Sequence, residues 1–310
     1  MSWDPVFDNI DRCVGIEMRP QGLPIGLIPQ LYEVARAGGD PLSLRAATVL
    51  NDGSVGRVAC ITGIVGAPLV FGEIDGPLGA CVLAGALVGV GKSADVAVPA
   101  KLIPVAQAMQ RALGFEGGII DEMQLRVDDY DAAVTIEKLG RNRKGVAHNI
   151  FGHPRSDQEP VADEFIEGMN AANKPTVGIG DGGNEIGFGA IFDEARSIVP
   201  YGARCQCPCE DGMVTSTATK VLFPAAVSDF GAYAVTTALG VLNGRALLTA
   251  SASKIGEAIE AALRYGCLDG GTYQPGKLGD DGIPLWGVQA IVNALRCVSY
   301  QHFAATPRHG

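Results

Sequence analysis

The chain has 310 residues, of which 47% are hydrophobic and 19% are charged, so it is long enough to bury a large core. This composition, together with 42 glycines, is typical of a globular α/β protein and excludes a disordered or fibrous chain. The formal net charge of −10 is not offset by any basic stripe, and it excludes a nucleic acid or an anionic membrane surface as the main partner.

The N-terminal sequence MSWDPVFDNIDR has neither a basic leader nor an apolar run. The longest apolar stretch, residues 78–91, is too short and too rich in glycine to span a bilayer. We therefore expect a cytoplasmic protein with no membrane partner. The sequence leaves open whether the chain forms a homo-oligomer.

Short apolar runs rich in β-branched residues alternate with segments of helical period, which is the pattern of βα units around a mostly parallel sheet. We expect a single α/β catalytic domain over residues 1–310 with a Rossmann-like three-layer architecture, in which residues 1–56 form a mainly helical extension and residues 302–310 a frayed tail. In chain order, the predicted elements are a helix over 26–36, a strand over 57–64, a helix over 77–90, a strand over 94–98, a helix over 103–113, strands over 118–121 and 133–137, a helix over 158–172, a strand over 175–179, a helix over 185–197, strands over 204–207 and 221–227, and helices over 231–248, 254–265 and 284–300.

The sequence ALVGVGKS, residues 86–93, matches a relaxed phosphate-loop pattern. A true phosphate loop connects a strand to a following helix, whereas this segment connects a helix to a strand. We therefore predict that Lys92 and Ser93 bind no phosphate.

The sequence GIGDGGNEIGFG, residues 178–189, contains a G-x-G-x-x-G pattern between a predicted strand and a predicted helix. That context suits a dinucleotide. However, Asp181 and Glu185 stand where the pyrophosphate would approach, and their carboxylates repel it. A dinucleotide is therefore disfavoured here.

Three of the eight cysteines, Cys205, Cys207 and Cys209, form the run CQCPC. Zinc sites usually separate paired cysteine ligands by two or more residues. A spacing of one residue instead places alternate side chains on one face of a strand, and free cysteine is often buried. We predict a buried strand here, with a metal or redox site as the alternative.

Two acidic loops follow predicted strands. Glu73 and Asp75 lie in FGEIDGPLGA, and Asp181 and Glu185 lie in GIGDGGNEIGFG. Loops at the carboxyl ends of parallel strands converge on one crevice, so these four carboxylates can meet there and bind a hard cation such as Mg²⁺ or Mn²⁺. In a purely structural alternative, Asp75 and Asn184 cap helices and Glu185 is a favourable first-turn charge. Spacing alone does not decide between the two.

Four stretches, GEIDGPLGA, IEKLGRNRKGVAHN, GIGDGGNEIGFG and AAVSDFGAYAVTTAL, resemble the D-glutamate cyclase-like family in order and spacing, and YGARCQCPC and DDGIPLWGVQAIV match more weakly. The resemblance extends over roughly residues 57 to 295, and GDGGNEIG is its most specific part. It implies an α/β fold and a hydro-lyase that cyclises D-glutamate to 5-oxo-D-proline with loss of water. Asp229 and Phe230 depart from it, because the family usually shows asparagine and tryptophan there.

Such a ring closure requires an uncharged α-amine, an activated γ-carboxylate and a route for the departing oxygen. We expect a divalent cation on the acidic loops to polarise the γ-carboxylate. Asp181, Glu185 or His148 is the expected general acid or base. Arg141, with Arg143 or Lys138, is expected to clamp the α-carboxylate of this small anionic substrate. The remaining predicted substrate-binding residues are Asn149, Gly182, Gly183, Asn184, Ser228 and Tyr233.

Two other functions fit parts of the pattern. A metal-dependent phosphohydrolase is one, because Mg²⁺ bound by acids also suits phosphate esters. A non-catalytic module that binds a small metabolite or a metal is the other, since a fold alone does not fix a function. Parallel assays of 5-oxoproline formation and phosphate release separate these alternatives.

Overall fold

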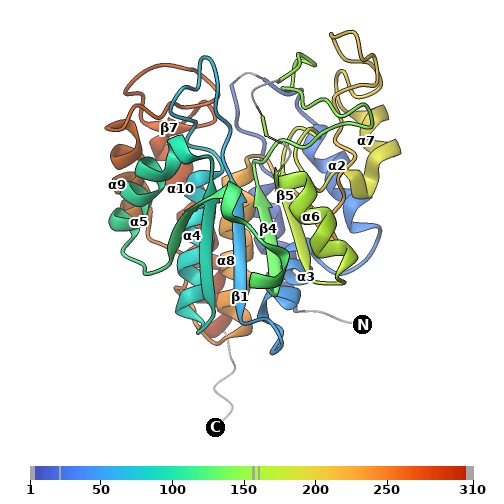
Figure 1. Ribbon diagram of the computed structural model, residues 1–310. Coiled ribbons are helices and arrows are strands. Elements are labelled where there is room, and N and C mark those ends of the chain that lie inside the picture. The colour runs from blue at the N-terminus through green and yellow to red at the C-terminus, as the bar shows by residue number, and fades with distance from the viewer. Residues whose placement is uncertain (1–3, 21, 156–157, 160, 305–310) are drawn as a thin grey trace.

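The computed structural model describes residues 4–20, 22–155, 158–159 and 161–304. At its centre lies a six-stranded sheet with the order β3-β2-β1-β4-β5-β6 (Figure 1). All neighbouring strands of this sheet pair in parallel. The order is that of a doubly wound Rossmann sheet, so the predicted fold class is confirmed. The strands are Arg57–Thr62 (β1), Ser93–Val98 (β2), Gly118–Asp121 (β3), Ala132–Ile136 (β4), Thr176–Gly180 (β5) and Val221–Pro224 (β6).

Helices cover both faces of the sheet, and a small antiparallel pair lies outside it. The α-helices are Val6–Val14 (α1), Leu27–Arg36 (α2), Leu42–Asn51 (α3), Pro77–Gly89 (α4), Ile103–Leu113 (α5), Val161–Ala171 (α6), Phe192–Ile198 (α7), Ser228–Leu242 (α8), Ala252–Leu263 (α9) and Leu285–Ala304 (α10). The short 3-10 helices are Ala100–Leu102 (η1), Glu122–Gln124 (η2), Val127–Asp129 (η3) and Gly189–Ile191 (η4). The small pair consists of Gly279–Asp280 (β7) and Ile283–Pro284 (β8).

Alternate residues of each strand point to opposite faces of the sheet. In β1, Val58 and Cys60 join the larger core, to which α1, α3, α4, α5, α8, α9 and α10 contribute. Ala59 and Ile61 face the other side, where α6 packs. Helix α2 packs against β6 and α7. These layers give the three-layer arrangement predicted from the sequence.

Helices α4 and α8 pack against each other on the face of the sheet that carries the larger core. Helix α4 has no charged residue, and Asp229 is the only charged residue of α8. A helix that is apolar on all sides is stable when it is buried on all sides. The first turns of both helices contribute to the site described below.

Gly79 allows the close approach of α4 and α8, because a Cβ there would lie 2.4 Å from Asp229 Oδ1 and 3.0 Å from the Cβ of Ala232. We expect Gly79→Ala to lower the free energy of unfolding by about 2 to 3 kcal/mol, since overpacking forces neighbouring elements apart. Chemical denaturation measures this change. Gly256→Ala in α9 is the control, because its Cβ would approach nothing closer than Gln289 Nε2 at 3.3 Å. Equal losses in both variants would contradict the argument.

Two predicted elements differ from the structure. Residues 204–207 form turns and bends instead of a strand. Pro208 follows directly, and proline cannot donate to a strand ladder. The helix predicted from residue 185 begins only at Phe192, because residues 181–188 form a closed loop.

The ends of the chain differ in smaller ways from the prediction. Helices α1 and α3 lie within the region predicted only as a mainly helical extension. Helix α10 continues to Ala304, so residues 302–304 are helical, while the rest of the predicted tail lies outside the described residues. Among the helices described, none combines the length and apolar character needed to cross a membrane.

Candidate active site

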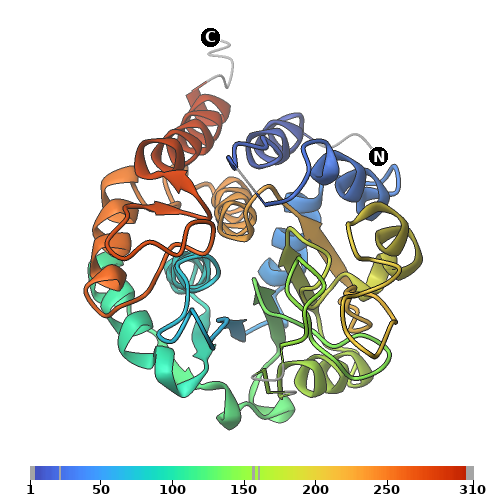
Figure 2. The same cartoon turned by 90° about the horizontal axis from the view of Figure 1, so that it is seen from above.

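The loops at the carboxyl ends of β1, β4 and β5 and the segment between α9 and α10 lie at the same end of the sheet (Figures 1 and 2). Residues of these segments, together with Arg19, line a cavity of about 80 Å³. This volume is small for a ligand pocket, so it suits a small metabolite better than a dinucleotide. The charged and polar residues that line it are Arg19, Glu73, Asp75, Glu137, Asn149, Arg155, Asp181, Asn184, Tyr273 and Asp281.

Three buried carboxylates meet in this cavity. Asp75, Glu137 and Asp181 each place one oxygen within 4.8 Å of the oxygens of the other two. A second group of the same kind shares Asp75 and adds Asp229 and Asp280. The sequence correctly placed Asp75 and Asp181 on neighbouring loops, and the structure brings them together.

Glu137 is the member of the first group that the sequence did not single out. It follows the last residue of β4 and has a φ of 45°. A side chain other than glycine is strained in this left-handed region, and such strain is found at functional sites. Its Oε2 accepts a hydrogen bond of 2.6 Å from Ser228 Oγ. Glu137 is therefore held in one orientation from the α8 side.

Burial changes the acidity of these groups. It raises the pKa of Asp75 well above the usual range, and the carboxylates of Asp280 and Asp181 raise it further. The pKa of Glu137 is likewise raised by burial and then by Asp181. Burial also raises the pKa of Asp181, although Arg19 opposes that shift. Burial therefore favours the binding of a proton or a cation by these carboxylates.

Arg19 is the cation at the centre of the site. Its Nη1 lies 3.1 Å from Asp181 Oδ2 and also forms an ion pair with Asp281. The cavity lining contains two arginines, Arg19 and Arg155, and five carboxylates. The two arginines cannot compensate five ionised carboxylates, so the remaining carboxylates need protons or a bound cation.

Several buried oxygens around the cluster have no hydrogen-bond partner among the described residues. Among them are Glu73 Oε1 and Asn184 Oδ1. The buried carboxyl groups of Asp229 and Asp280 lie within hydrogen-bonding reach of each other. A buried polar atom without a partner is costly, and a bound cation or ligand removes that cost. The oxygen-only chemistry of this set fits Mg²⁺ or Mn²⁺.

Asp75 and Asp229 hold the first turns of two helices reciprocally. Asp75 Oδ1 accepts a hydrogen bond of 2.8 Å from the backbone N–H of Asp229 in α8. Asp229 Oδ1 accepts hydrogen bonds from the backbone N–H groups of Gly76 (2.8 Å) and Gly79 (2.7 Å) at the start of α4. The capping alternative for Asp75 therefore holds, but the capped helix is α8. A carboxylate has two oxygens, so capping and facing the cavity are compatible.

Glu185 does not line the cavity, in contrast to the prediction. Its carboxylate folds back and accepts hydrogen bonds from the backbone N–H groups of Gly182 (3.0 Å) and Gly183 (2.9 Å). Gly183 has a φ of 98°, which allows the chain to turn here at little steric cost. Glu185 thus closes the glycine-rich loop, which leaves Asp181 as the loop's carboxylate in the cavity.

Asn184 lines the cavity as predicted, but it caps no helix, because no helix follows it directly. Its Nδ2 donates a hydrogen bond of 2.9 Å to the carbonyl oxygen of His148. Asn149 also lines the cavity. Its Oδ1 accepts hydrogen bonds from the backbone N–H groups of Phe151 and His153, which fix the turn that carries it.

The predicted clamp residues lie elsewhere. The Nζ of Lys138 is buried, lies 2.6 Å from Glu122 Oε2 and donates to the carbonyl of Gly63. Arg141 pairs with Asp163 (3.6 Å) and Glu164 (3.7 Å) on α6. Neither residue lines the cavity, because each is drawn to a carboxylate outside it. The arginines that line the cavity are Arg19 and Arg155.

Three other predicted residues lie outside the cavity lining. Ser228 is completely buried beside Glu137, and Tyr233 is completely buried one turn further along α8. His148 is also completely buried, and its Nε2 lies 3.3 Å from Cys207 Sγ, so the imidazole points toward the cysteines. A role for His148 as general acid or base in the acidic cavity is therefore not supported by its position.

Sequence reasoning missed six charged or polar residues that line the cavity or lie directly behind it, namely Arg19, Glu137, Arg155, Tyr273, Asp280 and Asp281. Glu137 had a usable signal, because it stands at the carboxyl end of a predicted strand. The acid pair of DDGIPLWGVQ, Asp280 and Asp281, offered a second signal. Arg19 and Tyr273 had none, since only tertiary packing brings them to the cavity.

Comparisons with known proteins identify the family of this chain. The family model for the C-terminal region of D-glutamate cyclase-like proteins matches residues 33–296. The chain is also 26% identical over 192 residues to the mitochondrial D-glutamate cyclase of Homo sapiens. That alignment covers 55% of this chain and 30% of the human protein, so the chain corresponds to less than a third of its relative. From the extent of the family match, the chain belongs to the D-glutamate cyclase-like family.

Proposed function

We propose that the protein cyclises D-glutamate, or a closely related small amino dicarboxylate, to 5-oxo-D-proline with loss of water. The observation that carries this proposal is the small cavity in which buried carboxylates and two arginines face one another. Membership of the D-glutamate cyclase-like family supports the reaction class.

The cavity offers a place for a divalent cation. Asp75, Glu137 and Asp181 are the proposed ligands, because their oxygens lie within 4.8 Å of one another. A bound Mg²⁺ or Mn²⁺ would neutralise these carboxylates and act as a Lewis acid toward the γ-carboxylate of the substrate. Ser228 supports the site by holding Glu137 through its 2.6 Å hydrogen bond.

Arg19 and Arg155 are the proposed partners of the substrate's carboxylates. Both line the cavity, and a guanidinium binds a carboxylate through two parallel hydrogen bonds. Arg19 is fixed by its ion pairs with Asp181 and Asp281, so it is oriented before a substrate arrives. Preorganised cations of this kind reduce the entropic cost of binding.

The reaction forms a bond between the α-nitrogen and the γ-carboxyl carbon. Two protons leave the ammonium group, and one carboxylate oxygen departs with them as water. Glu73 is the proposed proton carrier, because it lines the cavity and its Oε1 has no hydrogen-bond partner in the described residues. Burial raises the pKa of Glu73 well above the usual range, with Asp281 adding to the shift, and a carboxyl group with a raised pKa is suited to proton transfer.

The proposal is tested by incubating the protein with D-glutamate and measuring 5-oxoproline by chiral chromatography. We expect product in the presence of Mn²⁺ or Mg²⁺, loss of product with EDTA, and recovery when Mn²⁺ is restored. L-glutamate and a generic phosphate ester serve as comparison substrates. Absence of 5-oxoproline together with metal-dependent phosphate release would show a phosphohydrolase instead.

A further inference from the structure

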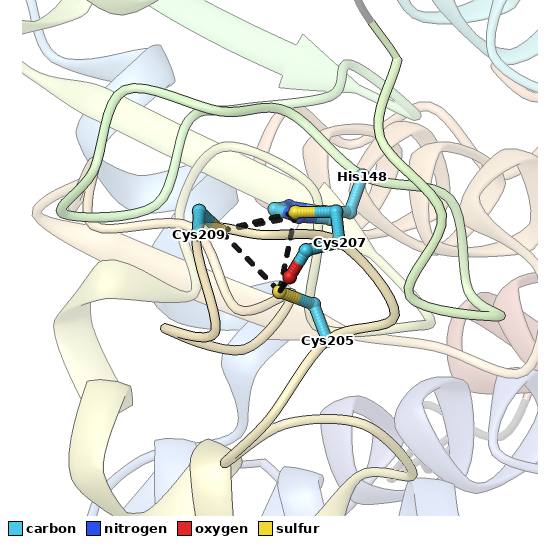
Figure 3. A group of neighbouring side chains, drawn as sticks. All are labelled: His148, Cys205, Cys207 and Cys209. Atoms are coloured by element: carbon cyan, nitrogen blue, oxygen red, sulfur yellow. Dashed lines mark hydrogen bonds between the residues drawn. The ribbon is translucent and has the colours of Figure 1, made fainter.

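A second cluster of side chains of the kind that bind metals, shown in Figure 3, contains no residue of the acidic cavity lining. It consists of His148, Cys205, Cys207 and Cys209, whose ligand atoms all lie within 4.8 Å of one another. Cys207 Sγ lies 3.3 Å from His148 Nε2 and 3.2 Å from Cys209 Sγ. Cys205 Sγ lies 3.5 Å from Cys207 Sγ and 3.3 Å from Cys209 Sγ. The proposed cyclisation uses none of these four side chains.

The separations match the edges of a small tetrahedron. Zinc bonds of about 2.3 Å to sulfur and about 2.0 Å to nitrogen place tetrahedral ligand atoms about 3.5 to 3.8 Å apart. The Nε2 of His148 and the Sγ of Cys209, at 3.7 Å, are within that range, and the sulfurs are slightly closer. A disulfide requires about 2.05 Å, so no pair of these sulfurs is bonded.

The cluster joins two loops that are distant in the sequence. His148 comes from the loop after β4, and the three cysteines come from the segment between α7 and β6. The backbone N–H of Gln206 donates a hydrogen bond of 2.8 Å to the carbonyl of Gly152, and this bond joins the two loops. The three cysteines are separated by one residue each, and the turn at Pro208 lets their sulfurs approach one point. An extended strand with the same sequence would hold these sulfurs apart along its length.

A neighbouring amide supports the sulfurs. Asn142 Nδ2 donates to Cys209 Sγ at 3.4 Å and to the carbonyl of Gly212 at 2.8 Å. Amide donors around a coordinating atom orient it and are typical of the surroundings of metal ligands. Three sulfurs and one imidazole nitrogen form the Cys₃His set of structural zinc sites, whereas Mg²⁺ and Mn²⁺ prefer oxygen.

We propose that His148, Cys205, Cys207 and Cys209 bind one structural Zn²⁺ that clamps the loop after β4 to the segment before β6. With four protein ligands the site is closed, so the ion has no open position for substrate. The clamp acts on the cavity wall, because Asn149 adjoins His148 and Asn184 donates to the carbonyl of His148.

The test uses the whole chain, purified under reducing conditions without chelator. Elemental analysis should find one Zn²⁺ per chain. After removal of zinc, titration with Co²⁺ alone should produce the visible bands of tetrahedral cobalt and a thiolate-to-cobalt charge-transfer band. Cys207→Ser should lose zinc and the charge-transfer band. Cys297→Ser, which changes an exposed cysteine of α10, should keep both.

Asp181→Asn provides a second control, because it changes the acidic cavity and should leave the zinc content unchanged. The zinc content therefore tests the zinc site independently of the cyclase activity. If Cys207→Ser does not fold, the Co²⁺ spectrum of the unmodified chain decides. A reduced chain that holds no zinc and shows no charge-transfer band with Co²⁺ would overturn the proposal, as would a disulfide among these cysteines in protein purified under reducing conditions.

Discussion

Asp181→Asn is expected to lower kcat/KM for 5-oxoproline formation by about 10³-fold or more, because it removes one of three carboxylates proposed to bind the cation. The substitution keeps the size of the side chain and removes its charge. Mn²⁺ affinity, measured by calorimetry, should fall in parallel. Arg19 retains its ion pair with Asp281, so the fold should remain intact.

Asp128→Asn is the matched control, because it makes the same chemical change at an exposed position of η3. It should leave activity, Mn²⁺ affinity and thermal unfolding unchanged. Full activity and unchanged Mn²⁺ affinity in Asp181→Asn would show that the acidic loop is only a tight turn, and the cation mechanism would then have to be abandoned.

Arg19→Met is expected to lower the free energy of unfolding by about 3 to 5 kcal/mol in the presence of EDTA. The guanidinium is only 11% exposed and compensates the buried Asp181 and the partly buried Asp281, so its removal leaves both carboxylates without their cation. Adding Asp281→Asn to the variant should restore part of the loss, because one uncompensated charge disappears. Chemical denaturation of the two single variants and the double variant measures the coupling.

Arg204→Met tests whether the loss depends on burial. Arg204 pairs with Glu210, but the two side chains are 73% and 61% exposed. An exposed ion pair contributes about 0 to 1 kcal/mol, so this variant should remain close to the unmodified protein. If Arg19→Met lowers the free energy of unfolding as little as Arg204→Met does, the cavity is more hydrated than the burial of Arg19 indicates. Mn²⁺ should stabilise Arg19→Met more than the unmodified chain, because the ion supplies the missing positive charge.

The sequence predicted the sheet well because strand and helix periodicities differ. It also predicted that Asp75 and Asp181 meet, since each lies on a loop that follows a strand of the same parallel sheet. Both inferences depend on local pattern and on a general property of this fold class. Neither requires knowledge of which distant side chains pack together.

The remaining site residues depend on tertiary partners. Lys138 and Arg141 resembled a substrate clamp in sequence, but buried carboxylates outside the cavity pair with them. Glu185 was expected beside Asp181, but the amides of its own loop bind its carboxylate first. Arg19 had no local signal at all. In each case the competing partner is visible only after the chain has folded.

The one-residue spacing of Cys205, Cys207 and Cys209 is compatible with a strand and also with a turn that gathers the sulfurs. Alternate residues share a face in a strand, and that led to the predicted strand over 204–207. Pro208 and the turns around it place the three sulfurs together without a strand. The fourth member, His148, is separated from Cys207 by 59 positions, so no motif with fixed spacing could reveal the group.

The acidic cavity takes its residues from almost the full span of the chain, from Arg19 before α2 to Asp281 between β7 and β8. A proteolytic fragment that lacks either Arg19 or Asp281 therefore carries an incomplete set of its walls. A single cut between α8 and α9 separates Asp281 from Arg19, Asp75 and Asp181. The two pieces regain the cavity only by reassociating, through the packing of α9 on α5 and of α10 on α8 and α1. Binding of a ligand in this cavity would thus report that both ends of the polypeptide have docked, which makes it a natural readout for fragment complementation.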